Sequence, residues 1–379
     1  MTGTSMVITV TALAGALVAP LSSLATLPLS LQFVATMATT VPASFIMRRF
    51  GRRAGFLIGA VSGGVGGVLN VFALLAHDFV LFCVGSAMIG VLAGFAVYYR
   101  FAAADCADEQ SRSRAISWVM AGGVIAAFAG PNLARATADI MVGTSFAGTF
   151  AALAALQVVT LTLLCFVDIP RLTAEERKDK GRPLGLILRQ PAAIVAILGA
   201  VAGYSAMTLV MTATPLAVMG HNLKFGDAAF IIQWHVFAMF APSFFTGSII
   251  KRFGAIAVIG LGAVLILACV AINLQGTGKL HFVAALMALG LGWNFMFIGG
   301  TALLTSVTAK PEQAKVQGLN DFLVFGFVAL ASLSSGATYQ ALGWEMVNLG
   351  ALPGVGLALL AALWLAWARR GGQPESAKV

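Results

Sequence analysis

Long apolar segments are the feature that most limits what this chain can fold into. A helix needs about 20 apolar residues to cross a bilayer, and the sequence holds twelve such segments. They lie at about 2–20, 26–47, 54–76, 79–104, 115–137, 145–167, 192–219, 228–250, 255–274, 281–305, 317–338 and 346–367. Only 10% of the residues are charged, against about 25% in soluble domains, and the mean hydropathy is +0.94. We therefore expect an all-α polytopic membrane protein with twelve transmembrane helices.

The distribution of basic residues predicts the topology. Twelve spans place both termini on one side of the membrane, and 20 of the 23 Lys and Arg residues fall at that side. Cytoplasmic connections carry an excess of Lys and Arg, so we expect both termini in the cytoplasm and the chain in a bacterial-type inner (plasma) membrane. The net charge of +9 then reflects topology, and we expect no nucleic-acid partner.

The beginning of the chain is unusual for a first span. Met1 leads directly into apolar sequence, with no basic residues before it. A cleavable signal peptide would carry a basic region there. We expect a first helix that is short or truncated, which leaves open a start upstream of Met1.

The sequence shows no motif for a cofactor, a metal or an enzyme active site. The four cysteines have no C-x-x-C or Cys/His spacing, and "GTGKL" at 276–280 lacks the rest of a nucleotide-binding loop. No pairing of a nucleophile with a base stands out among the spans. We expect no cofactor, no metal and no enzymatic activity.

A charged connection divides the chain into two halves. Residues 168–190 hold ten charged residues of both signs, with six apolar segments on each side. We therefore predict an N-terminal six-helix bundle at 1–167, a cytoplasmic linker at 168–190, a C-terminal bundle at 191–370 and a cytoplasmic tail at 371–379.

A short basic turn occurs in both halves. "SFIMRRFGRR" at 44–53 and "GSIIKRFG" at 247–254 both follow the second apolar segment of their half, and Gly51 precedes Gly254 by 203 residues. This paired motif resembles the signature of the major facilitator superfamily. The resemblance implies two pseudo-symmetric six-helix bundles and a secondary active transporter that works by rocker-switch alternating access. It also implies a cytoplasmic gate, for which the matching residues here are Arg48, Arg49, Gly51, Arg52, Arg53, Lys251, Arg252, Gly254 and Asp321.

Both copies of the motif depart from the family at one position. Where the family has an acidic residue facing a helix N-terminus, this chain has Arg48 and Lys251. A cation is unfavourable at the positive end of a helix, so we predict a charge-swapped latch between Arg48 and Asp321. Lys251 would pair in the same way with Asp105, Asp108 or Glu109. The alternative is that Asp321 only stabilises the N-terminus of its own helix.

Ionisable residues inside spans are candidates for proton coupling because they are expensive to bury. We name His235, Asp321 and Arg100 for this role. The alternatives are a neutral His235 bonded to a neighbour, and an Arg100 that reaches the interface or pairs with Asp105.

In the family, spans one, four, seven and ten line a central cavity. The matching polar and aromatic side chains here, with those of span eight beside them, are Tyr204, Thr208, Met211, Gln233, Trp234, His235, Trp293, Asn294 and Phe297. Some of them could be ordinary helix contacts. The set is aromatic and uncharged, which favours a planar, hydrogen-bonding solute over a small anion. We predict an aromatic or vitamin-like metabolite, with riboflavin-type solutes included.

The direction of transport is predicted from a weakened efflux signature. "GGVIAAFAGPNLA" at 122–134 loosely resembles the motif of proton-coupled efflux members, but Ala134 replaces its last glycine. Span four also has no arginine at its centre. We therefore favour a proton-coupled uptake permease, a symporter that works as a monomer in the lipid bilayer, with a drug or metabolite efflux pump as the alternative.

Overall fold

The computed structural model describes residues 1–99, 102, 112–141, 143–167, 169 and 182–371. In these ranges the regular secondary structure is helical. The helices of the first half, with one short 3-10 turn η1, are α1 (Thr2–Val18), η1 (Ser22–Leu24), α2 (Leu27–Phe50), α3 (Arg52–Ala76), α4 (Phe79–Ala96), α6 (Arg112–Thr137) and α7 (Ala147–Phe166).

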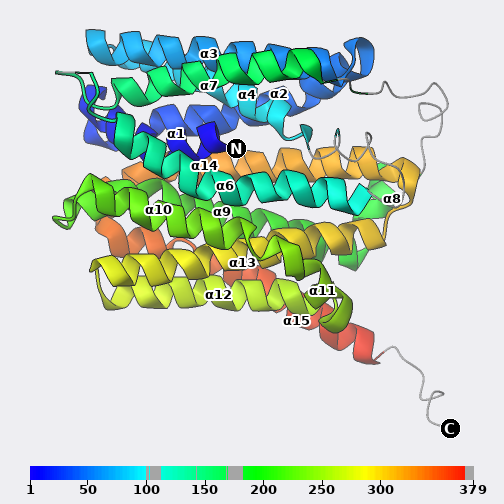
Figure 1. Cartoon of the computed structure of the whole chain (residues 1–379). Helices are drawn as coiled ribbons and strands as arrows, with labels where there is room; N and C mark the ends of the chain where they lie inside the picture. The colour runs from blue at the N-terminus through cyan, green and yellow to red at the C-terminus, as the bar shows by residue number, and fades with distance from the viewer. Residues whose placement is uncertain (100–101, 103–111, 142, 168, 170–181, 372–379) are drawn as a thin grey trace.

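The second half follows the short helix α8 (Leu184–Leu188). Its helices are α9 (Pro191–Gly220), α10 (Phe225–Phe240), α11 (Ser243–Phe253), α12 (Ala255–Gln275), α13 (Lys279–Ser306), α14 (Lys310–Leu349) and α15 (Leu352–Gly371). We call the end of the molecule at which α8 lies the linker end; it is on the right in Figure 1.

The predicted apolar segments all overlap helices. In the part of the chain that the structure describes, eight helices are long and apolar enough to cross a membrane, or nine if the bent pair α10 and α11 forms one span. Helix α1 is shorter, with 17 residues, in line with the expected short first helix. The multi-pass character is confirmed, whereas the count of twelve spans stays a prediction.

Proline explains the broken span formed by α10 and α11. Helices α10 and α11 meet at a 44° bend, and Pro242 stands at the junction. Because proline has no N–H and its ring clashes with the preceding turn, it bends or breaks a helix. The predicted span 228–250 is therefore two helices at an angle.

The repeated basic turn has the same backbone in both halves. Gly51 has φ 92° and ψ 156°, and Gly254 has φ 84° and ψ 151°. Each amide donates to the carbonyl four residues earlier, on Met47 and Ile250, at 2.9 and 2.8 Å. This region of φ and ψ is open essentially to glycine alone. The turn ends one helix and starts the next without a connecting loop.

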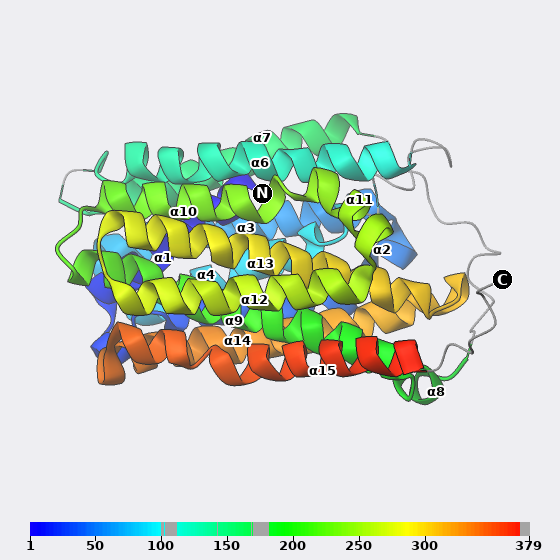
Figure 2. The same cartoon turned by 90° about the horizontal axis from the view of Figure 1, so that it is seen from below.

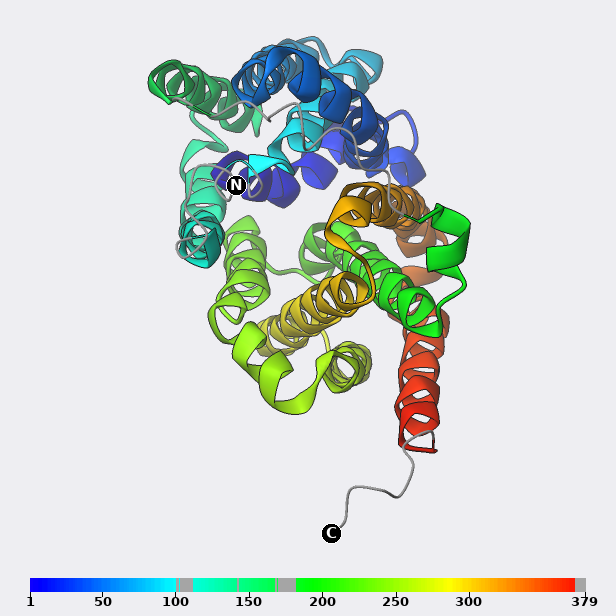
Figure 3. The same ribbon diagram turned by 90° about the vertical axis from the view of Figure 1, so that its right-hand side faces the viewer.

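Two pairs of helices join the halves. Helix α2 packs against α14 on one side, and α6 packs against α10 on the other. Figure 3, which looks at the linker end, shows these pairs on opposite sides of the molecule, with α1 and α9 between them. Figure 2 shows α15 along the outer edge of the second half, where it packs against α9 and α12.

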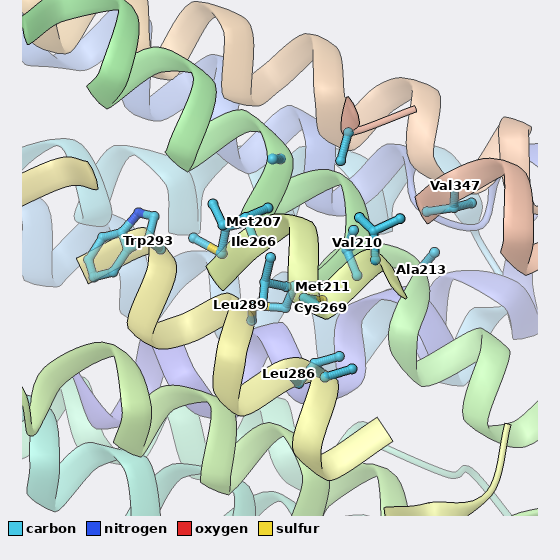
Figure 4. Packing of buried hydrophobic residues seen from close by; sticks show 14 of the residues in the cluster. Met207, Val210, Met211, Ala213, Ile266, Cys269, Leu286, Leu289, Trp293 and Val347 are labelled. Atoms are coloured by element: carbon cyan, nitrogen blue, oxygen red, sulfur yellow. The ribbon is translucent and has the colours of Figure 1, made fainter. Parts of the chain in front are cut away.

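Each half has its own apolar core. The largest core lies in the second half and includes Met207, Val210, Ile266 and Leu289 (Figure 4). The first half has two smaller cores, one around Phe82 and Phe150 and one around Phe56. Separate cores are what two bundles need in order to move as units.

Candidate solute cavity

A cavity of about 150 Å³ lies between the two halves. Five helices supply its wall, which are α1, α2 and α6 from the first half and α9 and α10 from the second. The lining residues are Met1, Thr4, Ser5, Ile8, Leu29, Phe33, Ala126, Tyr204, Met207, Thr208, Met211, Thr212, Val236, Met239 and Phe240. The side chains of the wall are apolar or carry hydroxyl groups, and none is charged, so the wall suits an uncharged solute.

An aromatic cluster stands behind the cavity wall on the second half. The ring of Tyr204 lies 5.2 Å from Trp293, 5.6 Å from Phe297 and 5.8 Å from Phe325, measured between centroids. The rings of Trp293 and Phe297 are stacked at 5.3 Å with only 8° between their planes. Rings held in this way offer flat, preorganised surface to a planar solute.

The structure brings three predicted binding residues together in the cavity wall. Tyr204, Thr208 and Met211 all line it, at the three- and four-residue spacing that puts them on one face of α9. Trp293 and Phe297 lie behind Tyr204 in the aromatic cluster. Their contact with a solute stays a prediction.

Asn294, another predicted binding residue, is not among the residues that line the cavity. It is fully buried, and its amide nitrogen donates to the Met239 carbonyl and to Ser243 Oγ, each at 2.7 Å. Its amide oxygen accepts from Thr246 Oγ1 at 2.7 Å. The side chain thus ties α13 to the bend between α10 and α11. With these groups engaged, the geometry does not favour a direct contact between Asn294 and the solute.

His235 also faces away from the cavity. Its side chain is fully buried, and Nδ1 lies 2.7 Å from the carbonyl oxygen of Leu286 on α13. Because a carbonyl only accepts, Nδ1 carries the hydrogen. The structure gives His235 the arrangement of a neutral histidine bonded to a neighbour, and it is not among the lining residues. A role in proton coupling stays a prediction.

Gln233 and Trp234 lie at the interface between α6 and α10. Gln233 Oε1 accepts from Asn132 Nδ2 at 2.8 Å. The ring of Trp234 meets Phe128 edge-on, with centroids 6.2 Å apart. These two residues join the halves, and neither is among the lining residues.

Sequence reasoning missed several wall residues. Ser5, Phe33 and Phe240 line the cavity, yet each is a single residue of ordinary type within an apolar span. Helical periodicity could have indicated Ser5, which shares a face of α1 with Ile8. Nothing in the sequence separated this face from the others.

Comparison with known proteins identifies the family. A family model described as Major Facilitator Superfamily matches residues 1–277, which is more than half of the chain. The chain belongs to the Major Facilitator Superfamily. It is therefore a membrane transporter of a small solute, and the prediction that it is not an enzyme is confirmed.

The family relatives include one with a named solute. The chain is 44% identical to a riboflavin transporter of Brucella anthropi over 340 residues, which cover 89% of this chain and 85% of that protein. It is 29% identical over 361 residues to an uncharacterized MFS-type transporter of Bacillus subtilis, with 90% of this chain and 83% of that protein covered.

Solved structures of superfamily members share the fold. A D-xylose-proton symporter aligns with a TM-score of 0.73 at 16% identity, covering 96% of this chain and 94% of that one. The xylose transporter of E. coli, in a partially occluded inward-open conformation, aligns with a TM-score of 0.71 at 15% identity, covering 99% and 95%. These alignments over nearly the whole chain confirm the predicted fold of two related helix bundles.

The predicted gate of this superfamily member lies at the linker end. Arg53 donates to the Cys165 carbonyl at 2.6 Å and so caps the end of α7. Arg49, Lys251 and Arg252 are exposed. Asp321 Oδ1 accepts from the neighbouring Asn320 amide at 3.2 Å.

The latch itself is not tested. The side chain of Arg48 lies outside what the structure describes, as do Arg100, Asp105, Asp108 and Glu109. The pairing of Arg48 with Asp321 and the pairing of Lys251 with an acidic residue stay predictions, as does proton coupling through Arg100.

The linker is fastened to the second half at Arg182. Its guanidinium makes paired 2.7 Å hydrogen bonds to both carboxylate oxygens of Glu312, and its backbone N–H donates to the same carboxylate at 2.9 Å. Glu312 is only 2% exposed and also accepts from the Ala309 backbone N–H at 2.9 Å. The Arg182 hydrogen bonds, with that of Ala309, hold the pKa of Glu312 well below its usual range. The ion pair therefore persists at neutral pH.

At the end opposite the linker the halves pack tightly. Ser30 on α2 donates to Ser332 on α14 at 3.0 Å, and both are buried. Gly336 on α14 leaves room for Thr26, which a Cβ at that position would overlap. A small apolar cluster of Ala12, Ala25 and Leu216 lies nearby. These contacts join the two halves at this end.

Proposed function

We propose that this transporter moves riboflavin, or a closely related flavin, into the cell. The observation that carries the proposal is the cavity wall, where the Tyr204 ring, backed by the stacked rings of Trp293 and Phe297, stands close to uncharged hydroxyl groups. A flavin has a flat, uncharged heteroaromatic ring and a polyhydroxylated chain, and so needs both kinds of surface. The 44% identity to a riboflavin transporter over most of the chain supports the same solute.

The cavity has to widen to hold such a solute. Its volume of about 150 Å³ is below the range of roughly 300–1,000 Å³ typical of sites for drug-sized ligands. Met207, Met211 and Met239 line it, and methionine side chains adapt easily to a new neighbour. Rocking of the two halves would supply the remaining space.

We further propose that the protein works as a monomer in the inner membrane, with both termini in the cytoplasm. One chain supplies both halves and thus the complete cavity. The excess of basic residues on the linker side supports this orientation. We propose uptake driven by protons, with Asp321 and His235 as the titratable candidates.

The experiment is riboflavin uptake in a bacterial strain that cannot make flavin and lacks its own transporter. Cells that produce this protein should grow on low external riboflavin and accumulate labelled riboflavin. Adding an uncoupler should reduce the accumulation if protons drive uptake. Failure to accumulate riboflavin, while the protein is present in the membrane, would refute the proposal; faster loss of preloaded flavin would favour efflux instead.

A further inference from the structure

Buried hydroxyl groups in α1 and α9 fall into two kinds. Thr9, Thr11 and Thr214 each donate to the carbonyl four residues earlier in their own helix, at 2.8 Å. Ser5 Oγ and Thr208 Oγ1 have no hydrogen-bond partner among the residues that the structure describes. Ser5 is 5% exposed and Thr208 is 2% exposed, so the two hydroxyls have little access to bulk water.

Ser5 and Thr208 share one location, whereas a third unpartnered hydroxyl, Ser205 Oγ on α9, does not line this cavity. Ser5 and Thr208 both line the cavity, one from each half. Thr9, Thr11 and Thr214 do not. A polar group that is buried without a partner destabilises the protein, and such a group in a native structure needs an explanation. The coincidence of a missing partner with the cavity wall points to a partner that comes from outside the chain.

The local packing fixes where each hydroxyl stands. Gly130 lies so close to α1 that an added Cβ would be 2.6 Å from Ser5 Cβ and 2.9 Å from the Met6 backbone nitrogen. This close approach holds the Ser5 turn of α1 against α6. Thr208 follows Tyr204 by one helical turn, so its hydroxyl and the aromatic cluster lie on the same face of α9.

We propose that Ser5 and Thr208 are specificity-determining residues that hydrogen-bond the hydroxylated chain of the solute, while the Tyr204 cluster contacts its planar ring. This inference rests on the proposed function and adds which part of the solute each residue recognises. Each hydroxyl can donate one hydrogen bond and accept others, which matches the hydroxyl groups of a polyol chain. Because the two residues belong to different halves, the hydroxylated chain of one bound solute bridges the halves.

The test compares two flavins that differ only in the chain. Riboflavin carries a ribityl chain, and lumiflavin carries a methyl group at the same position. Dissociation constants for both are measured on the purified full-length protein and on Ser5→Ala, Thr208→Val and the double variant. Thr9→Val and Thr214→Val are the matched controls, since they remove buried hydroxyls from the same helices but away from the cavity.

We expect each substitution to weaken riboflavin binding about 3- to 10-fold, in line with the loss of one hydrogen bond, and to leave lumiflavin binding within about 2-fold. The controls should keep the unsubstituted protein's preference for riboflavin. Without solute, the melting temperature of Ser5→Ala and Thr208→Val should stay the same or rise, because an unpartnered buried hydroxyl has been removed.

The outcomes separate the inference from the proposed function. If the unsubstituted protein binds riboflavin and the Ser5 and Thr208 variants keep its preference over lumiflavin, the assignment of these residues is wrong and the proposed function stands. Equal weakening of both flavins also contradicts the assignment, since it would indicate a change of cavity shape. If the unsubstituted protein binds neither flavin, the proposed function fails and the inference falls with it.

Discussion

The two halves are alike at their basic turns and different at the cavity. Gly51 and Gly254 have the same backbone conformation within about 10°. At the cavity, the first half presents Phe33 beside aliphatic side chains such as Ile8 and Leu29, whereas the second presents Tyr204 backed by three further aromatic rings. The repeat therefore preserves the basic turns, and under the proposed function most of the aromatic contacts with the solute would come from the second half.

The aromatic residues of the first half have a different use. Phe82 meets Phe150 edge-on at 5.4 Å, and Phe56 stacks on Tyr99 at 4.3 Å. Both pairs belong to the cores of the first half. An aromatic pair alone thus does not identify a binding site; its position relative to the cavity does.

The largest expected effect comes from removing the ring that faces the cavity. Tyr204→Leu keeps an apolar side chain but removes the ring that we propose contacts the flavin, and an aromatic contact is worth ~0.5–1.5 kcal/mol beyond the area it buries. We expect the dissociation constant for riboflavin to rise about 10- to 100-fold. The matched change in the first half, Phe82→Leu, should lower the melting temperature and leave binding unchanged. Equal loss of affinity in both variants would show that the effect of Tyr204→Leu comes from lost stability and not from a lost contact with the solute.

Substituting the glycine of either basic turn should have a smaller effect, and the loss of thermal stability should be similar in the two halves. Gly51→Ala and Gly254→Ala each force a side chain into a conformation that costs ~1–3 kcal/mol, and we expect similar falls in thermal stability. Gly247→Ala is the control: no atom lies within 4 Å of its added Cβ, and alanine in a helix is favoured over glycine by ~0.5–1 kcal/mol. A variant at Gly254 that is as stable as the unsubstituted protein would mean that the two turns are not equivalent.

The smallest expected effect is on the melting temperature, when the ion pair of Arg182 and Glu312 that joins the linker to the second half is removed. Because the folded state lowers the pKa of Glu312, the pair stabilises the protein above the ordinary glutamate value of 4.5. That contribution is lost as the pH falls below this value toward the lowered pKa. Glu312→Gln should therefore melt at a lower temperature at pH 7 and approach the unsubstituted protein at acid pH. A constant difference across the pH range would contradict this origin.

The sequence predicted the architecture because its signals are local. Each apolar segment, each proline or glycine and each basic turn can be recognised within one stretch of the chain, without knowing how distant segments pack. Helical periodicity predicted that Tyr204, Thr208 and Met211 share one face of α9, and the resemblance to the family predicted that this face lines the cavity. The short α1 was expected from the apolar sequence that directly follows Met1, and the two halves from the charged connection between them.

The direction of polar side chains was harder to predict. His235 and Asn294 are conspicuous because they are polar residues inside apolar spans, yet both bond to neighbouring helices in their own half. Ser5 drew no notice, although it lies in the cavity wall. Polarity in a span shows that a partner is needed, but only the packing of distant segments decides whether that partner is protein or solute.

The bond network of Asn294 has a consequence for engineering. Asn294 holds the bend that positions Met239 and Phe240, two residues of the cavity wall. The width of the cavity is thus adjustable from α13, at a position that does not line it. A library that varies Asn294 together with Ser243 and Thr246 would test solutes of new sizes without substituting any residue of the cavity wall.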